Sequence, residues 1–322
     1  MRVVFFGTPT FAVPTLQMLL DSPHEVVAVV TQPDKPAGRG HKLNAPPVKV
    51  LALEHDIPVL QPKSVRTPEF AEQLRALAAD VAVVVAYGKI LPKAVLDAPR
   101  YGCLNVHASL LPAYRGAAPI QWAIINGEQH TGITIMQLDE GLDTGPMIAR
   151  RELPILEDDD TLSLTNMLSY VGAELMVEVL AQLERDGSLP KEAQDPEKAS
   201  YAPLIEREMA RIDWSKPAEK ILWAVRGFQP WPKTFTSLKG RELKITGAEA
   251  CATEWVPESA FDERIKPGTV VEIFKGRGFV VRTGGEKGLV LVTRVQPPDK
   301  PEMGAQDFVN GGGLEIGTVL GT

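Results

Sequence analysis

The sequence predicts an α/β protein in which a Rossmann-like domain with a mostly parallel sheet is followed by a small β-barrel domain. A chain of 322 residues is long for one hydrophobic core, so two domains are expected. The first half alternates apolar strand patterns with helical patterns, as parallel sheets do. Beyond residue 209, short strand patterns recur between Gly and Pro residues, which is typical of small all-β domains.

The first residues predict a strand–helix–strand unit. An apolar strand over 3–6 is followed by a helix over 11–20, with Pro14 in its first turn, and by a strand over 24–31. Such crossovers are right-handed and make the two strands parallel. The turn at 7–12 lacks the spaced glycines of a dinucleotide fingerprint, so no NAD site is predicted.

The same rhythm continues to residue 92. Apolar residues at helical spacing predict helices over 46–56 and 68–78, with a short strand over 57–60 between them. The run 80–86 is the most hydrophobic strand and is expected at the centre of the sheet. Ligands of open α/β sheets bind at the carboxyl ends of the strands, so the loop 87–92 is a candidate binding segment.

The segment 31–49 is a long loop rich in Pro, Gly and basic residues. Its charged and titratable side chains include Lys35, Arg39, Lys42 and Lys49. Loops of this length without secondary structure are uncommon and often functional. A surface insertion without function is the alternative.

The stretch 102–145 organises the chain. It predicts a strand over 103–107, a helix over 117–126 and a second strand over 131–138. The loop 139–145, with two glycines and three carboxylates, follows the second strand.

Three polar side chains of this stretch form a candidate catalytic set. Asn105 and His107 alternate with apolar residues and are expected on one face of their strand. An amide can donate to a developing oxyanion, an imidazole can exchange a proton, and Asp143 could orient the imidazole or hold a water. The alternative is that all three are ordinary polar residues at a strand end and in a turn.

The remaining patterns complete the two domains. A strand over 146–153 is expected to pair antiparallel with 131–138, and a helix runs from Asp160 or Thr161 to Arg185. The predicted boundaries are 1–189 for the first domain, 190–207 for a linker and 208–322 for the second domain. In the second domain a helix is expected over 213–225. Phe228 and Trp231 are expected in the core, and a platform for base stacking is the alternative. Strands are expected over 234–238, 241–250, 269–274, 278–283 and 288–292.

Composition indicates a cytoplasmic protein without metal or membrane segment. No apolar run approaches the roughly 20 residues of a membrane span, and the amino-terminal residues do not resemble a secretory signal. Cys103 and Cys251 lie far apart and offer no metal spacing. The net charge of −7 argues mildly against a nucleic-acid partner. However, residues 208–322 hold 16 Lys and Arg against 15 Asp and Glu, whereas residues 1–207 hold 18 against 26.

Three linked motifs identify a family. N-V-H-x-S-L-L-P, Y-R-G-A-A-P-I and L-D-x-G-x-D-T-G follow one another in this order from residue 105 to residue 145. The chain thereby resembles the formyltetrahydrofolate-dependent formyltransferases along nearly its whole length. The resemblance implies that Asn105, His107 and Asp143 are the catalytic residues and that 10-formyltetrahydrofolate is the co-substrate. It also implies a folate site formed by Ser109, Leu110, Leu111, Pro112, Tyr87, Gly88, Ile90 and Leu91. Packing in the core is the alternative role for Ile90 and Leu91.

The tRNA-specific members of the family carry the same Q-P-D-x-P-A-G-R-G insertion, which approaches the acceptor end of the tRNA. The resemblance therefore implies transfer of the formyl group to the α-amine of initiator methionyl-tRNA by a monomer with an OB-like second domain. The expected RNA contacts are Arg39, Lys42, Lys239, Arg241 and Lys244.

Three other functions remain open. The acceptor could be a small amine such as a ribonucleotide or an amino sugar, although neither needs a basic insertion or an added barrel. Water could replace the amine, which would make the protein a formyltetrahydrofolate hydrolase. The protein could also be an RNA-binding module with a degenerate folate pocket, which the complete Asn/His/Asp set argues against.

Overall fold

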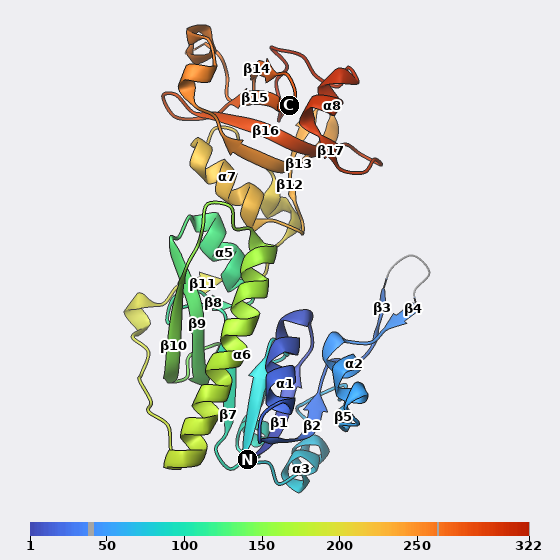
Figure 1. Cartoon of the computed structure of the whole chain (residues 1–322), viewed down its shortest axis with the longest axis vertical. Helices are drawn as coiled ribbons and strands as arrows, with labels where there is room; N and C mark the ends of the chain where they lie inside the picture. Colours follow the sequence, from blue (N-terminus) through green and yellow to red (C-terminus); the bar gives the residue numbers. More distant parts are fainter. Residues whose placement is uncertain (38–41, 263, 322) are drawn as a thin grey trace. The chain divides into compact units, whose positions relative to one another are not determined.

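The computed structural model describes residues 1–37, 42–262 and 264–321 (Figure 1). Contacts divide the chain into two units. The first consists of Met1–Pro119, His130–Pro154 and Leu164–Pro203, and the second of Ile120–Gln129, Ile155–Ser163 and Leu204–Thr322. The chain therefore enters the second unit twice before its last segment. The predicted domain boundaries at 189 and 208 stay a prediction.

A seven-stranded sheet forms the first unit, and it is mostly parallel, as predicted. Its order is β10-β9-β7-β6-β1-β2-β5. The pairs from β5 to β7 are parallel, whereas β9 and β10 pair antiparallel at one edge. The strands are β1 (Arg2–Gly7), β2 (Glu25–Val30), β5 (Val59–Leu60), β6 (Val81–Val85), β7 (Cys103–His107), β9 (His130–Gln137) and β10 (Met147–Pro154).

Four helices of this unit agree with the predicted helical periodicity. They are α1 (Val13–Leu20), α2 (Pro47–Glu54), α3 (Pro68–Ala76) and α6 (Thr161–Asp186). The short helix α4 (Lys93–Leu96) was not predicted. Pro14 lies in the first turn of α1, where its missing N–H breaks no helical hydrogen bond. Thr67 caps α3, because its hydroxyl accepts from the backbone N–H of Phe70.

The long loop 31–49 was predicted without secondary structure, and that prediction is wrong in part. Strands β3 (Lys35–Ala37) and β4 (Lys42–Asn44) pair as an antiparallel hairpin. At its base, the ammonium group of Lys49 donates to the carboxylate of Asp34 at 2.8 and 2.9 Å and to the amide oxygen of Gln61 at 2.9 Å.

The two faces of the sheet are packed differently. One face contributes Val84 and Cys103 to a core cluster that also contains side chains of α3 and α4. On the opposite face α6 runs along β7 and β9, and its Gly172 lies against Val106 and Ile133 (Figure 1). Successive side chains of a strand point to opposite faces, and Val106 points towards α6. Its neighbours Asn105 and His107 therefore lie on the face away from that helix.

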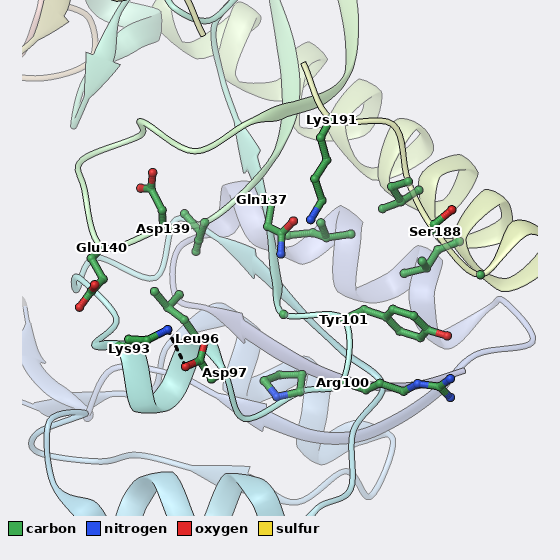
Figure 2. Close-up of a pocket in the computed structure, with 17 residues that line it drawn as sticks. Lys93, Leu96, Asp97, Arg100, Tyr101, Gln137, Asp139, Glu140, Ser188 and Lys191 are labelled. Atoms are coloured by element: carbon green, nitrogen blue, oxygen red, sulfur yellow. Dashed lines mark ion pairs between the residues drawn. The ribbon is translucent and has the colours of Figure 1, made fainter. Parts of the chain in front are cut away.

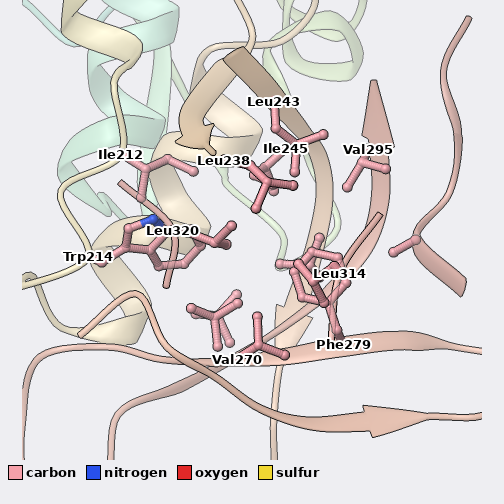
Figure 3. Packing of buried hydrophobic residues seen from close by; sticks show 14 of the residues in the cluster. Ile212, Trp214, Leu238, Leu243, Ile245, Val270, Phe279, Val295, Leu314 and Leu320 are labelled. Atoms are coloured by element: carbon pink, nitrogen blue, oxygen red, sulfur yellow. The ribbon is translucent and has the colours of Figure 1, made fainter. Parts of the chain in front are cut away.

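The second unit is built on an antiparallel sheet in the order β12-β13-β16-β15-β14, with β17 paired to β16. Its core contains Trp214, Phe279 and the aliphatic residues drawn in Figure 3. The OB-like description stays a prediction. The strands are β12 (Thr234–Leu238), β13 (Arg241–Ala250), β14 (Val270–Phe274), β15 (Gly278–Arg282), β16 (Leu289–Gln296) and β17 (Met303–Gly304). The helices of this unit are α7 (Ala218–Gly227) and α8 (Ala305–Asn310), and most of α5 (Pro119–Asn126) also belongs to it.

Two expectations for this unit are corrected. Helix α7 does not begin at Asp213, because the Asp213 side chain accepts from the backbone N–H of Ser215 in a turn and Pro217 then caps the helix. Phe228 is buried as predicted, but Trp231 is 59% exposed.

Candidate active site

Strand β7 carries two of the three candidate catalytic residues. It lies between β6 and β9, with Asn105 opposite Val84 on one side and Met136 on the other. His107 is the last residue of the strand and lies opposite Thr134. Both side chains are almost completely buried. A central strand thus holds them rigidly at its carboxyl end.

The side-chain amide of Asn105 has no hydrogen-bond partner among the described residues. The residue is 9% exposed, and its amide does not belong to the unpaired polar groups that are sealed from solvent. A side chain that is buried but keeps an accessible, unpaired amide can donate to a group that enters from solvent.

The imidazole of His107 is oriented by a backbone carbonyl. Its Nε2 lies 2.9 Å from the oxygen of Tyr114. A carbonyl oxygen can only accept, so Nε2 must carry a proton in this hydrogen bond. The other nitrogen, Nδ1, lies 3.7 Å from Oδ2 of Asp143. Nδ1 is therefore the nitrogen available for proton exchange.

Asp143 reaches this position through an unusual backbone conformation. Its φ is 54°, in the left-handed region, and its Oδ2 accepts from the backbone N–H of Gly116 at 2.9 Å. The loop returns tightly to β9 at Gly145, where an added Cβ would lie 1.9 Å from the oxygen of Gln137. The structure thus brings Asn105, His107 and Asp143 of the prediction to one place, with the carboxylate facing the imidazole.

The predicted folate segment 109–112 is held by its own hydrogen bonds. The hydroxyl of Ser109 donates to the oxygen of Ala113 at 2.6 Å, and its carbonyl accepts from the hydroxyl of Thr134 at 2.7 Å. The hydroxyl of Thr134 also accepts a hydrogen bond from the backbone N–H of Leu111 at 3.0 Å. Leu111 is buried against Met136, whereas Leu110 and Pro112 are half-buried.

The second predicted folate segment divides into buried and exposed residues. Tyr87 packs edge-on against Phe6 with ring centroids 5.3 Å apart, and burial raises the pKa of its hydroxyl to about 12. Leu91 is 4% exposed and belongs to the core, whereas Ile90 is 57% exposed. Gly88, at φ 83°, has nothing within 4 Å of an added Cβ. Only Gly88 and Ile90 therefore present open surface.

The predicted RNA contacts come from the β3–β4 segment and from the second unit, and each is described within its own unit. Arg39 lies outside the described residues, and Lys42 is the first residue of β4. Lys239 and Arg241 are exposed at the turn between β12 and β13. Lys244 lies opposite Phe235 and is half-buried on the side of β13 away from its core-facing neighbours.

Sequence reasoning missed one residue that contacts the candidate catalytic loop and that is itself held by Arg115. The side-chain amide of Gln194 donates to the carbonyl oxygens of Asp143 at 2.8 Å and Gly145 at 2.7 Å. Its amide oxygen accepts from the guanidinium of buried Arg115. The only sequence signal was the Tyr114–Gly116 motif that contains Arg115, because Gln194 lies in the predicted linker.

A pocket of about 610 Å³ occupies a different part of the first unit (Figure 2). It is lined by α4, the start of β7, the end of β9 and the end of α6, and it contains the Lys93–Asp97 ion pair at 2.8 Å. None of the predicted catalytic or folate residues lines it. Its position therefore gives no support for a folate site there.

None of the described helices combines the length and hydrophobicity of a membrane-spanning segment. The described residues also bring together no group of three His, Cys, Asp or Glu side chains able to hold a metal ion.

Comparison with known proteins identifies the family. Residues 1–180 match the model described as formyl transferase, and residues 204–313 match the formyl transferase C-terminal domain. The chain belongs to the formyl transferase family, which confirms the resemblance found in the sequence.

Particular relatives are similar over the full chain. The methionyl-tRNA formyltransferase of Synechococcus sp. (strain JA-3-3Ab) is 51% identical over 320 residues, which cover 98% of this chain and 97% of that protein. The methionyl-tRNA formyltransferase of Bacillus subtilis (strain 168) is 48% identical over 99% of this chain and 98% of that protein.

A solved structure shares the fold. HypX from Aquifex aeolicus in complex with tetrahydrofolic acid matches with a TM-score of 0.62 and 19% identity, over 96% of this chain and 47% of that one.

Proposed function

We propose that this protein transfers the formyl group of 10-formyltetrahydrofolate to the α-amine of initiator methionyl-tRNA, as a cytoplasmic monomer. One observation carries the proposal. In a chain about half identical to methionyl-tRNA formyltransferases along its whole length, the end of β7 carries two polar side chains. The amide of Asn105 has no hydrogen-bond partner among the described residues, and His107 faces Asp143.

In this reaction the amine attacks the formyl carbon directly. A new C–N bond forms, the formyl oxygen gains negative charge, and the bond from the formyl carbon to N10 of the folate then breaks. Asn105 donates its free amide N–H to the developing oxyanion, the kind of preorganised interaction that is stronger in the transition state than in the ground state.

His107 and Asp143 handle the protons. The amine must lose a proton and N10 must gain one. Because Tyr114 holds the proton on Nε2, exchange takes place at Nδ1, which faces the carboxylate of Asp143. A distance of 3.7 Å exceeds a direct hydrogen bond, so the carboxylate acts by holding a water between the two groups.

The folate would bind against the two predicted segments. Gly88 can offer backbone groups to the polar edge of a pteridine and Ile90 an exposed apolar surface, while buried Tyr87 and Leu91 support the loop from behind. Ser109, Leu110, Leu111 and Pro112 would form the second wall beside the catalytic residues.

The tRNA would contact the basic hairpin and the second domain, an OB-like barrel that begins near residue 208. The contacts we assign are Arg39, Lys42, Lys239, Arg241 and Lys244. Lysine and arginine neutralise phosphates and release counterions, so this binding should weaken steeply with salt.

An acceptor comparison tests the function. With 10-formyltetrahydrofolate as donor, we expect formylation of charged initiator tRNA and none of amino sugars or amino ribonucleotides. Preference for a small amine would replace the acceptor in the proposal. Release of formate at the same rate with and without an acceptor would identify a hydrolase instead.

A further inference from the structure

We infer that Gln194 is a positioning residue for the transfer reaction, because its side chain fixes the backbone that carries Asp143. This inference rests on the proposed role of Asp143 opposite His107. Gln194 comes from a segment predicted to be only a linker, and it lies 51 positions from Asp143 in the sequence.

The first half of the contact is made to the catalytic loop. The Gln194 Nε2 group has two N–H bonds, and they are used on the carbonyls of Asp143 and Gly145, at 2.8 and 2.7 Å. These carbonyls lie on either side of Thr144. The side chain of Gln194 therefore holds the loop where it returns to the sheet. We call the two hydrogen bonds from Gln194 to these carbonyls the clamp.

The second half of the contact orients the amide. The Oε1 atom of Gln194 accepts from Nε of Arg115 at 3.0 Å and from Nη2 at 2.8 Å. Arg115 is 6% exposed, and a guanidinium can only donate. The amide oxygen must therefore face Arg115, and the amide nitrogen must face the loop carbonyls.

Arg115 and its neighbour Gly116 hold Asp143 from the other side as well. They form β8 (Arg115–Gly116), which pairs in parallel with β11 (Tyr201–Ala202). The N–H of Gly116 donates to Oδ2 of Asp143. The same two-residue strand thus fixes the carboxylate directly and fixes the backbone of Asp143 through Gln194.

The clamp matters because Asp143 is not in a relaxed conformation. Its φ of 54° is disfavoured for a residue with a side chain, so the surrounding contacts must maintain it. If the carbonyls of Asp143 and Gly145 lose their donor, the loop can relax and move the carboxylate away from Nδ1 of His107.

Two substitutions test the clamp in the full-length protein. Gln194→Ala removes all four hydrogen bonds. Gln194→Glu keeps the acceptor for Arg115 but places a carboxylate oxygen against the two carbonyls. For both variants we expect kcat for formyl transfer to fall about 10- to 100-fold, the effect of misplacing a catalytic group by about 1 Å. The KM for the folate should change less than about threefold, because only the transition-state contact is lost.

A double-mutant cycle separates positioning from a general structural role. In the Asp143→Asn background the further change Gln194→Ala should reduce kcat less than about twofold, since the group that it positions is already disabled. Glu192→Gln is the matched control: Glu192 lies in the same segment and pairs with exposed Arg150, but it does not contact the loop. It should leave kcat unchanged.

Several outcomes would overturn the inference. These are kcat within twofold of the wild type in both Gln194 variants, equal losses in the wild-type and Asp143→Asn backgrounds, or failure of both variants to fold. If the wild-type protein itself does not formylate charged initiator tRNA, the proposed function fails, whatever the variants do.

Discussion

Nδ1 of His107 faces Oδ2 of Asp143 at 3.7 Å, while Nε2 of the same ring is held 2.9 Å from the oxygen of Tyr114. The ring is therefore fixed by the backbone on one side and paired with a carboxylate on the other. This arrangement divides the work of the site: Asn105 meets the charge on the formyl oxygen, and His107 with Asp143 moves the protons.

The first prediction concerns Asn105 and His107. Asn105→Ala and His107→Ala should each lower kcat by about 10²-fold or more, the scale of an oxyanion donor or acid–base group. Asn105→Asp should lose at least as much, because a carboxylate of the same shape opposes the oxyanion. Folate binding by fluorescence titration should remain. Near-normal turnover in both alanine variants would exclude these roles.

The second prediction contrasts two neighbours in the folate loop. Ile90→Asn removes an exposed apolar surface and should raise the KM for the folate about tenfold, with little change in the unfolding midpoint. Leu91→Ala leaves a cavity in the core and should lower the free energy of unfolding by about 2–5 kcal/mol. Steady-state kinetics and thermal unfolding measure both effects. An unchanged KM in Ile90→Asn would remove Ile90 from the site.

The third prediction concerns pH and the base of the β3–β4 hairpin. Hydrogen bonds from Gln61 and then Lys49 hold the pKa of Asp34 below its ordinary value of 3.8. A lowered folded-state pKa stabilises the fold above pH 3.8, and this contribution is lost as the pH falls through the folded-state value. Asp34→Asn should therefore lower the unfolding midpoint at pH 7, and the difference from the wild type should shrink below about pH 4.

The control for Asp34 is Asp97→Asn, which breaks the exposed ion pair with Lys93. Exposed pairs contribute little, so this variant should differ only slightly from the wild type at either pH. A difference for Asp34→Asn that stays constant from pH 7 to pH 3 would contradict the prediction.

The fourth prediction concerns RNA binding by the second unit. Lys239→Ala and Arg241→Ala should each weaken binding of charged tRNA. The logarithm of the binding constant falls linearly with the logarithm of the salt concentration, and each variant should make this slope shallower by about one, the effect of losing one phosphate contact. The KM for the folate should not change. Lys198→Ala, which removes an exposed lysine paired with Asp195 in the first unit, should keep the full salt slope. Identical slopes in all three variants would exclude these contacts.

Much of the first unit follows from periodicity alone. The buried run at β6, the alternation along β7 and the helical spacing at α3 each agree with the structure, because burial on one or both faces leaves a direct pattern in the sequence. The predicted start of α7 was wrong because the sequence pattern also allows a helix from Asp213. In the structure Asp213 instead forms a turn, in which its side chain accepts from the backbone N–H of Ser215. The β3–β4 hairpin was missed because its strands are only three residues long.

By itself, the sequence determined the family, the mostly parallel sheet and the placing of Asn105 and His107 on one face, since all three follow from local order along the chain. Only the tertiary structure decided that Tyr87 and Leu91 are buried while Ile90 is exposed, and that Gln194 contacts the loop of Asp143. Those facts depend on which distant segments pack together. Hydrogen bonds between residues 51 and 79 positions apart leave no period in the sequence that could reveal them.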